Sequence, residues 1–242
     1  MSSSPFTYTR RTIITSARTS TNTETDTIPD QRMITISFSL RFILLACCVA
    51  WPGTALPQAQ VKAPVRTVKG QVLTSSSLPS IRLKFDKHFK YAGTQKFILY
   101  GRSQAEQFFF IDTDTDRQIK RLYLVQFEGY LPNINATYDY AVSETVALGG
   151  QTYIANSDSV PNVSGLLKQE PESDAARAVA FLTNKGFHLP EALKFRRFVR
   201  LVDDAKRNEF ILVYIEVTNT ASQKPDNEFS ARALAGVHVV NK

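Results

Sequence analysis

The chain of 242 residues contains only two cysteines and one tryptophan. These residues, Cys47, Cys48 and Trp51, all lie within or at the end of one short apolar run. Residues 56–242 therefore contain no cysteine. This absence excludes a disulfide, a thiolate nucleophile and a cysteine-ligated zinc or iron–sulfur centre from that part of the chain.

Motifs that carry catalytic or cofactor chemistry are also missing. No serine lies in a G-x-S-x-G nucleophile turn, and no glycine-rich loop has the pattern that cradles phosphate. The three histidines, His88, His188 and His238, are too far apart for a metal-binding spacing such as H-x-x-x-H. We therefore expect neither a metal nor another cofactor, and binding is favoured over catalysis.

Charged residues are scattered along the chain. Five of the 29 basic and three of the 22 acidic residues precede residue 56, which leaves a net charge of +5 for residues 56–242. The densest basic group is Lys194, Arg196, Arg197 and Arg200, which is typical of a solvated strand or helix face. The sequence contains no nucleic-acid-binding module, so we expect no nucleic-acid partner.

The apolar run over residues 42–51 has the layout of an export signal. Arg41 precedes it, and the small residues 53–55 follow it. Export signals combine a positive charge, an apolar core of roughly 7–15 residues and a small-residue cleavage site. We predict a signal peptide over residues 33–55 and a secreted or periplasmic protein with no stable membrane span after cleavage. Two alternatives stay open: an uncleaved membrane anchor, and lipidation of Cys47.

The first 32 residues have a different composition. Fourteen of them are serine or threonine, and no apolar periodicity accompanies them. Such a segment cannot bury enough apolar surface to fold, so residues 1–32 are predicted to be a disordered extension. An export signal acts near the N-terminus, which favours Met33 as the translation start and an untranslated segment before it. Translation from Met1 would instead make residues 1–32 a transit-type segment.

Residues 81–242 predict a single α+β domain, and residues 56–80 a linker with one edge strand. The domain is expected to hold a curved antiparallel sheet of about six or seven strands, built from a meander and a C-terminal hairpin and packed against one or two helices. Strands are predicted, from alternation or from β-branched and aromatic composition, over 81–86, 96–100, 107–111 and 119–127, which form the meander, and over 193–202 and 209–217, which form the C-terminal hairpin. Residues 145–154 are predicted to be a further strand or a hairpin. Helices are predicted after the capping Ser173 and over 228–235, and a polar loop over 156–172.

Two of the predicted strands are apolar on both faces. The segment 119–127 places Val125 on one face and Leu124 on the other, and the segment 209–217 has the same pattern. Such strands require cover on both faces. Two interpretations stay open: a bent sheet that encloses an apolar cavity, and an ordinary two-layer core without a cavity.

Three residues are candidates for acid–base chemistry. Glu106 and Glu128 adjoin strongly apolar strand segments, where burial would raise a carboxyl pKa and suit a general acid. His88 is the third candidate, because an imidazole titrates near neutral pH. Exposed carboxylates at strand ends are the simpler interpretation of the two glutamates.

Three tyrosines are candidates for ligand binding. Tyr100, Tyr123 and Tyr130 belong to segments in which aromatic residues accompany Gly or Pro near strand ends. Their hydroxyl groups beside apolar surface would suit the mouth of a pocket. The alternative is that these rings fill the core.

One acidic segment resembles the start of a calcium-binding loop. Asp112, Asp114 and Asp116 have the spacing of the first three calcium ligands. The sixth position is Arg117 where glycine is needed, and the twelfth is Tyr123 where a bidentate glutamate is needed. A solvated hairpin turn is therefore favoured over a metal site.

These observations favour an exported soluble domain that binds an apolar or amphipathic small molecule in a cavity of a curved sheet. Two other hypotheses stay open. One is an exported enzyme that uses carboxylate, tyrosine or histidine groups, and the other is a structural or partner-binding domain of the cell envelope. The sequence does not indicate the oligomeric state.

Overall fold

The computed structural model describes residues 65–142, 144–218 and 225–240. The predicted N-terminal extension, the predicted signal peptide at residues 33–55 and Cys47 lie outside the described residues. The structure therefore does not test the predictions of disorder, export and lipidation. Within the described residues, no helix is long and apolar enough to cross a bilayer.

The described residues form two antiparallel sheets, neither of them closed, and three helices. The seven-stranded sheet has the order β4 (Lys90–Leu99), β5 (Ser103–Thr113), β6 (Ile119–Tyr130), β10 (Asn208–Val217), β9 (Leu193–Leu201), β8 (Gln151–Val160) and β7 (Thr145–Leu148). The four-stranded sheet has the order β1 (Arg66–Lys69), β2 (Val72–Ser76), β3 (Ser80–Phe85) and β11 (Val237–Val239). The helices are α1 (Val163–Gln169), α2 (Asp174–Asn184) and α3 (Asn227–Ala235). The predicted antiparallel sheet with few helices is confirmed.

Most local pairings follow the sequence patterns. Strands β4, β5 and β6 form a meander, and β7–β8 and β9–β10 form hairpins. Strand β3 differs, because it pairs with β2 and β11 rather than with the meander. Its side chains alternate between buried and exposed, which suits a sheet with one face in water. A turn at residues 86–89 carries the chain to the other sheet, and in it the Asp86 side chain accepts a hydrogen bond from the His88 backbone N–H.

Two segments contain more regular structure than predicted. Residues 156–172 are not a polar loop: β8 continues to Val160, and α1 follows with Asn162 as its N-cap. The polar strand residues are stable there because β9 supplies partners, such as Arg197, whose Nε donates to Asn156 Oδ1 at 2.9 Å. Residues 66–76 form two strands, β1 and β2, where one edge strand is predicted.

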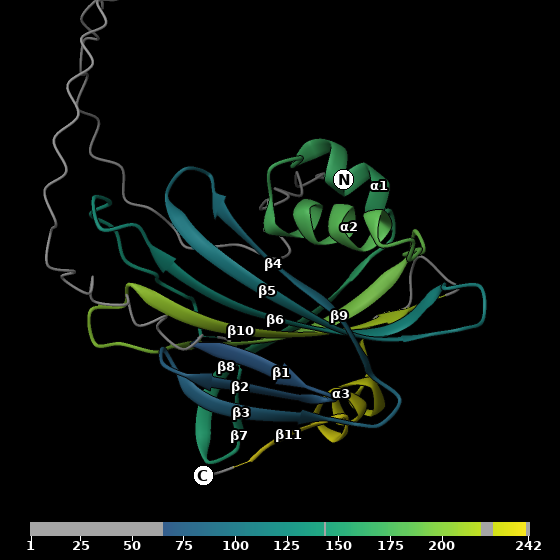
Figure 1. The fold of residues 1–242 in the computed structure, drawn as a ribbon, viewed down its shortest axis with the longest axis horizontal. Helices are drawn as coiled ribbons and strands as arrows, with labels where there is room; N and C mark the ends of the chain where they lie inside the picture. The colour runs from purple at the N-terminus through teal and green to yellow at the C-terminus, as the bar shows by residue number, and fades with distance from the viewer. Residues whose placement is uncertain (1–64, 143, 219–224, 241–242) are drawn as a thin grey trace, which may run out of the picture. The chain divides into compact units, whose positions relative to one another are not determined.

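Both faces of the seven-stranded sheet are buried. One hydrophobic core joins it to the four-stranded sheet and α3 through Phe85, Tyr123, Phe210 and Phe229, among others. A second core on the opposite face includes Leu124 and Val213 from the sheet and Val163, Ala178 and Leu182 from the helices α1 and α2. Figure 1 shows these helices on one side of the sheet and the four-stranded sheet with α3 on the other. The doubly apolar strands β6 and β10 therefore have the double cover that their sequences require.

The apolar space beneath α1 and α2 is small. A cavity of about 40 Å³ lies between these helices and the sheet, lined only by apolar residues such as Leu124, Leu166 and Leu182. Small-molecule sites measure roughly 300–1,000 Å³. In this conformation, the interior of the helical layer does not hold a ligand of that size, and candidate sites are found in surface grooves.

The far edge of the seven-stranded sheet reaches the four-stranded sheet at Gly149, in the β7–β8 turn. Gly149 has φ +59°, and a Cβ atom there would lie 2.3 Å from the Cβ of Val239 on β11. We expect Gly149→Ala to lower the free energy of unfolding by about 2–3 kcal/mol, because a left-handed backbone and an overfilled contact both cost energy. The measurement is urea denaturation.

Gly150 supplies the matched control for this contact. It also has a positive φ, +75°, but a Cβ atom there would meet no heavy atom within 4 Å. Gly150→Ala should therefore cost only the backbone strain, about 1 kcal/mol. Equal effects of the two substitutions would contradict a close contact between the turn and β11.

Candidate functional site

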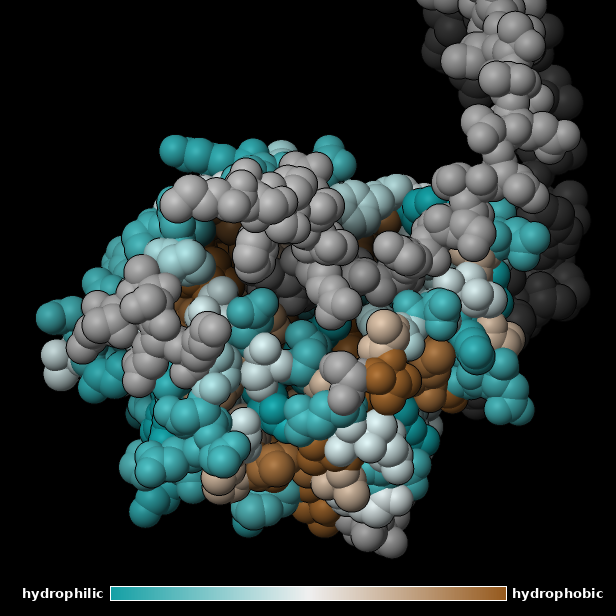
Figure 2. All heavy atoms as spheres, turned by 180° about the vertical axis from the view of Figure 1, so that it is seen from behind, coloured by the Kyte–Doolittle hydropathy of each residue, from teal (hydrophilic) through white to brown (hydrophobic). Residues whose placement is uncertain are grey.

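A groove opens at the end of strands β5 and β6, beside β1. It has a volume of about 320 Å³. Two of its apolar residues, Val65 and Leu78, are exposed, although large apolar side chains are mostly buried in the described residues. Figure 2 shows that apolar residues on one face of the molecule form small groups between hydrophilic ones. We name this feature the Glu106 groove; its lining residues are Val65, Arg66, Leu78, Lys96, Gln104, Glu106, Phe127, Glu128, Gly129, Tyr130, Leu131, Pro132 and Asn208.

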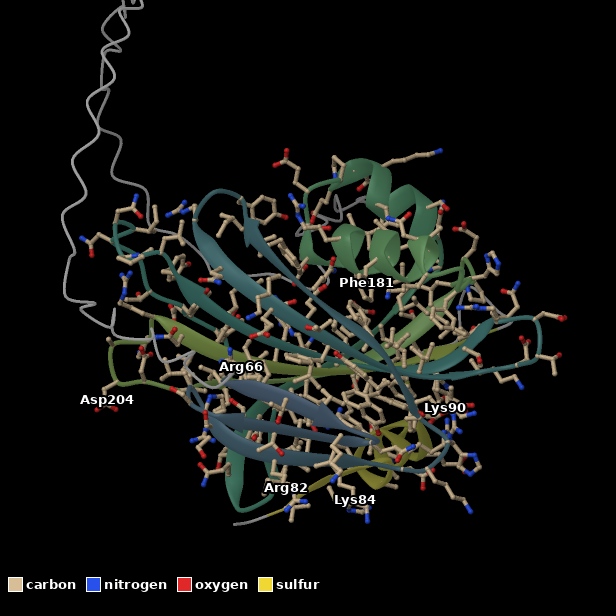
Figure 3. All side chains as sticks on the ribbon, in the orientation of Figure 1. Arg66, Arg82, Lys84, Lys90, Phe181 and Asp204 are labelled. Carbon is tan, nitrogen blue, oxygen red and sulfur yellow. The ribbon has the colours of Figure 1, made fainter. Side chains whose placement is uncertain are left out.

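The charged part of the groove is centred on Glu106. Its carboxylate lies 2.8 Å from Arg66 Nη1 and 3.2 Å from Lys96 Nζ. The Arg66 guanidinium also stacks 3.9 Å above the Phe127 ring. Figure 3 shows Arg66 between the two sheets. Two cations therefore hold one carboxylate at this end of the groove.

Lys96 is the accessible member of this group. Its side chain is 61% exposed, whereas those of Arg66 and Glu106 are 16% and 11% exposed. An ammonium group has three donors, so Lys96 retains donors for a ligand while it holds Glu106. Leu78, Leu131 and Pro132 provide apolar surface in the same groove.

A buried polar cluster lies behind the groove, on the helix-covered face of the sheet. It consists of Ser103, Gln107, Gln126, Glu128 and Tyr138. The Glu128 carboxylate accepts hydrogen bonds from Ser103 Oγ at 2.6 Å, Gln126 Nε2 at 2.6 Å and Tyr138 OH at 3.0 Å. Gln107 Nε2 donates to Gln126 Oε1 at 2.6 Å. Burial raises the pKa of Glu128, and these donors oppose the rise.

Glu209 lies directly across from Glu128 on the neighbouring strand. It is fully buried, and it accepts a hydrogen bond from the Tyr140 hydroxyl through Oε2, while Oε1 has no partner. Burial, followed by the charge of Glu128, raises the pKa of Glu209 well above its ordinary value. Burial also raises the pKa of Tyr138 and Tyr140, which keeps both phenols neutral donors. Two buried carboxyl groups on adjacent strands are therefore held by two tyrosines of one segment.

Four of the six candidate residues for catalysis or ligand binding lie in or near this region. Glu106, Glu128 and Tyr130 line the groove, and Tyr130 stacks on Tyr138 with ring centroids 4.4 Å apart. Tyr100 is a half-exposed residue of the β4–β5 turn, and burial followed by the charge of Asp174 raises its pKa to about 12. The carboxylates of Glu106 and Glu128 face opposite sides of the sheet, because Glu106 pairs with Phe127 and successive strand residues alternate.

Tyr123 and His88 are elsewhere. Tyr123 is fully buried in the core between the sheets, and its hydroxyl donates to the Ala233 carbonyl at 2.8 Å. His88 lies in the exposed turn after β3, with Nε2 3.9 Å from Asp86 Oδ1. Neither residue lines the Glu106 groove.

The three aspartates at the β5–β6 turn have protein partners or are exposed. Asp112 forms an ion pair with Arg121 at 2.5 Å. Asp114 accepts hydrogen bonds from the backbone N–H groups of Asp116 and Gln118 at 3.0 and 2.9 Å. In the described part of the chain, no group of three or more histidine, cysteine or acidic side chains is arranged to hold a metal ion.

The sequence analysis did not identify Arg66, Lys96, Tyr138, Tyr140 and Glu209 as site residues. One signal was present for Glu209: Gln126, Glu128 and Glu209 interrupt otherwise apolar strands at positions that share a face. Arg66 had no such signal, because it meets Glu106 only through the packing of β1 against the seven-stranded sheet. Lys96 lies directly opposite Glu106 in the β4–β5 hairpin, so its contact depends on the register of that hairpin.

Comparisons with known proteins do not identify a relative. No protein-family model matches the chain, no curated protein matches it in sequence, and no solved structure matches it.

Proposed function

We propose that this protein binds an amphipathic small molecule in the Glu106 groove. The apolar part of the ligand lies against Leu78, Leu131 and Pro132, and its polar group accepts a hydrogen bond from Lys96. The observation that carries the proposal is the meeting of an accessible cation, an ion-paired carboxylate and apolar walls in one groove of about 320 Å³. This volume is within the range of small-molecule sites, roughly 300–1,000 Å³.

The positions of the candidate acid–base residues favour a binding function over a catalytic one. Glu106 is held by two cations, and Glu128 is buried on the opposite face of the sheet, so the two carboxyl groups do not act together on one substrate. His88 is not in the groove.

We further propose that the seven-stranded sheet curves around the four-stranded sheet and gives the groove a rigid frame. The approach of Gly149 to Val239 supports this curvature. The proposal also includes export through the segment at residues 33–55, which the sequence pattern supports.

The test is native mass spectrometry of the protein purified from its own host, followed by solvent extraction of any bound molecule. We expect a bound species in the wild type. In a Gln104→Trp variant, an indole enters the groove beside Glu106, so occupancy should fall at least about tenfold. The absence of any bound molecule in the wild type would overturn the proposal.

Lys120→Trp is the matched control. Lys120 is an exposed residue of β6 near the opposite end of the β5–β6 pair, and it does not line the groove. This variant should keep the ligand at the wild-type level. Equal retention of the ligand by the Gln104 and Lys120 variants would show that the molecule is bound elsewhere.

A further inference from the structure

Strand β4 is the longest edge strand among the described residues. It has ten residues, whereas the other edge strands, β7, β1 and β11, have four, four and three. Within the part of the chain that the structure describes, β4 pairs only with β5, and no backbone hydrogen bond joins residues 90–98 to another element. One side of β4 therefore presents backbone N–H and C=O groups to which a further strand can add.

A groove lies between β4 and helix α2, and we name it the β4 groove. Its volume is about 240 Å³. Its lining consists of one residue of β4 and one face of α2 with the residue that follows it: Gln95, Arg177, Ala180, Phe181, Asn184 and Lys185. Gln95 Nε2 donates to the Arg177 carbonyl at 3.1 Å, and Phe181 stacks on Phe109 of β5 with ring centroids 4.7 Å apart. Figure 3 shows Phe181 between α2 and the sheet. These contacts fix α2 alongside β4.

Two cations of the helical side reach across to β4. The Arg177 guanidinium lies 5.2 Å from the ring of Phe97, which shares a face of β4 with Gln95. Lys185 lies closer to the start of β4, where its Cε atom would be 3.8 Å from a Cβ atom at Gly93. Both side chains are exposed, so their charged groups are accessible along the groove.

The charge of the β4 groove has no protein counterion. The lining contains neither aspartate nor glutamate. Among residues 65–142, 144–218 and 225–240, no carboxylate forms an ion pair with Arg177 or Lys185. Glu170, Glu172 and Asp174 precede Arg177 in sequence but lie outside the lining, and Asp174 is fully buried. The groove therefore favours an acidic ligand.

The opposite face of β4 exposes apolar side chains. Tyr91 and Ile98 are 37% and 44% exposed, although large apolar side chains are mostly buried in the described residues. Both lie on the face of β4 that is turned away from α1 and α2. Lys96 shares this face, and its charge is already paired with Glu106. A strand added to β4 would cover the two apolar side chains.

We propose that an extended acidic segment of a partner protein adds to β4 as a further strand of the seven-stranded sheet. Its backbone pairs with the free side of β4. Successive side chains of a strand point to opposite faces, so acidic residues at alternate positions meet Arg177 and Lys185 in the β4 groove. The residues between them are apolar and pack against Tyr91 and Ile98.

The same observations disfavour other occupants. A second copy of this chain would bring the exposed Lys90 and Lys96 of one β4 against the cations of the other, and like charges across an interface repel. A small molecule is disfavoured because the groove is smaller than the usual range of roughly 300–1,000 Å³. Neither Arg177 nor Lys185 lines the Glu106 groove, so the inference does not depend on the proposed function.

The experiment is a fluorescence anisotropy titration of the full chain against a labelled eight-residue peptide of alternating glutamate and valine. We expect saturable binding. A matching lysine–valine peptide should bind at least about tenfold more weakly, because its charges repel the groove. A glutamate–valine peptide N-methylated at alternate residues should be weakened as much, because it lacks the backbone donors that pair with β4. Absence of saturable binding, or equal binding of either control peptide, would overturn the proposal.

Charge-reversal variants assign the binding to the β4 groove. Arg177→Glu combined with Lys185→Glu should raise the Kd of the glutamate–valine peptide at least about tenfold. Lys84→Glu combined with Lys168→Glu is the matched control, because it changes the net charge equally at two residues outside the groove. All four side chains are exposed, so both variants should fold. Equal weakening by the two variants would indicate general attraction to a basic protein and would overturn the proposal.

Amide chemical shifts of the ¹⁵N-labelled chain locate the peptide. We expect the largest shifts along β4, at residues 93–98. Shifts confined to Gln104, Gly129 and Leu131 would place the peptide in the Glu106 groove and overturn this inference while leaving the proposed function intact. Light scattering tests the remaining occupant: a dimer that does not bind the peptide would assign β4 to a second copy of the chain and would also overturn the inference.

Discussion

Replacing Glu216 by alanine is expected to lower the free energy of unfolding by about 3–5 kcal/mol. Glu216 is a mostly buried residue of β10. Its carboxylate accepts hydrogen bonds from Arg232 of helix α3, at 2.8 Å from Nε and 3.0 Å from Nη2. It also lies 3.8 Å from the ammonium group of Lys194, whose side chain is only 5% exposed. Arg232 can turn toward water after the substitution, but Lys194 would remain a buried cation without this partner.

Glu228→Ala is the control for this result. Glu228 forms an ion pair with the same Arg232 at 3.8 Å, but its side chain is 87% exposed. Exposed pairs contribute about 0–1 kcal/mol, so this substitution should change stability little. Urea denaturation of both variants measures the difference. A cost for Glu216→Ala as small as that for Glu228→Ala would contradict the assignment of Glu216 as the buried link between β10 and α3.

Replacing Glu209 by glutamine is expected to raise stability, by an amount that increases with pH. The pKa of Glu209 lies well above its ordinary value, first because of burial and second because of the charge of Glu128 across the strand pair. In the unfolded chain, the carboxyl group ionises at its ordinary pKa, so between the two pKa values the folded chain binds more protons. Stability is therefore fully present below the unfolded pKa and falls by about 1.4 kcal/mol for each pH unit until the folded pKa is passed.

Glutamine removes this decline because it carries no charge and still accepts the hydrogen bond from Tyr140. The measurement is the free energy of unfolding from pH 5 to pH 8 in the wild type and in Glu209→Gln. Part of the decline should remain, since burial also raises the pKa of Glu128. Glu172→Gln, at an exposed position, controls for loss of one carboxylate. Parallel profiles for the wild type and Glu209→Gln would contradict the prediction.

The strands and hairpins could be predicted because their signals are local. The alternation of residues 81–86 and the β-branched composition of residues 209–217 each determine a strand from a few neighbouring side chains. Ser173 likewise marks the start of α2 through its own side chain, which accepts a hydrogen bond from the Ala176 backbone N–H. The error at residues 156–172 has the opposite cause, because partners on β9 stabilise a strand whose own sequence is polar.

The candidate site could be predicted only in part. Glu106 and Glu128 were identified because they adjoin apolar strand segments, and Tyr130 because it lies among Gly and Pro near a strand end; all three line one groove. The identity of their neighbours depended on long-range packing: Arg66 reaches Glu106 across 40 positions of sequence. A charged residue on an edge strand gives no local sign of the partner that it will meet.

The sequence by itself determined the secondary structure of most segments, the need of β6 and β10 for cover on both faces, and the absence of thiol chemistry after residue 56. Only the tertiary structure decided that a second sheet and three helices cover the two faces. It also decided that β3 pairs with β2 instead of joining the meander, and that Glu128 and Glu209 lie opposite each other in the interior. The physical reason is that periodicity within a segment specifies which face of a strand is buried. Strand partners and charge pairs depend on contacts between segments far apart in sequence, and the local pattern of one segment is compatible with several different partners.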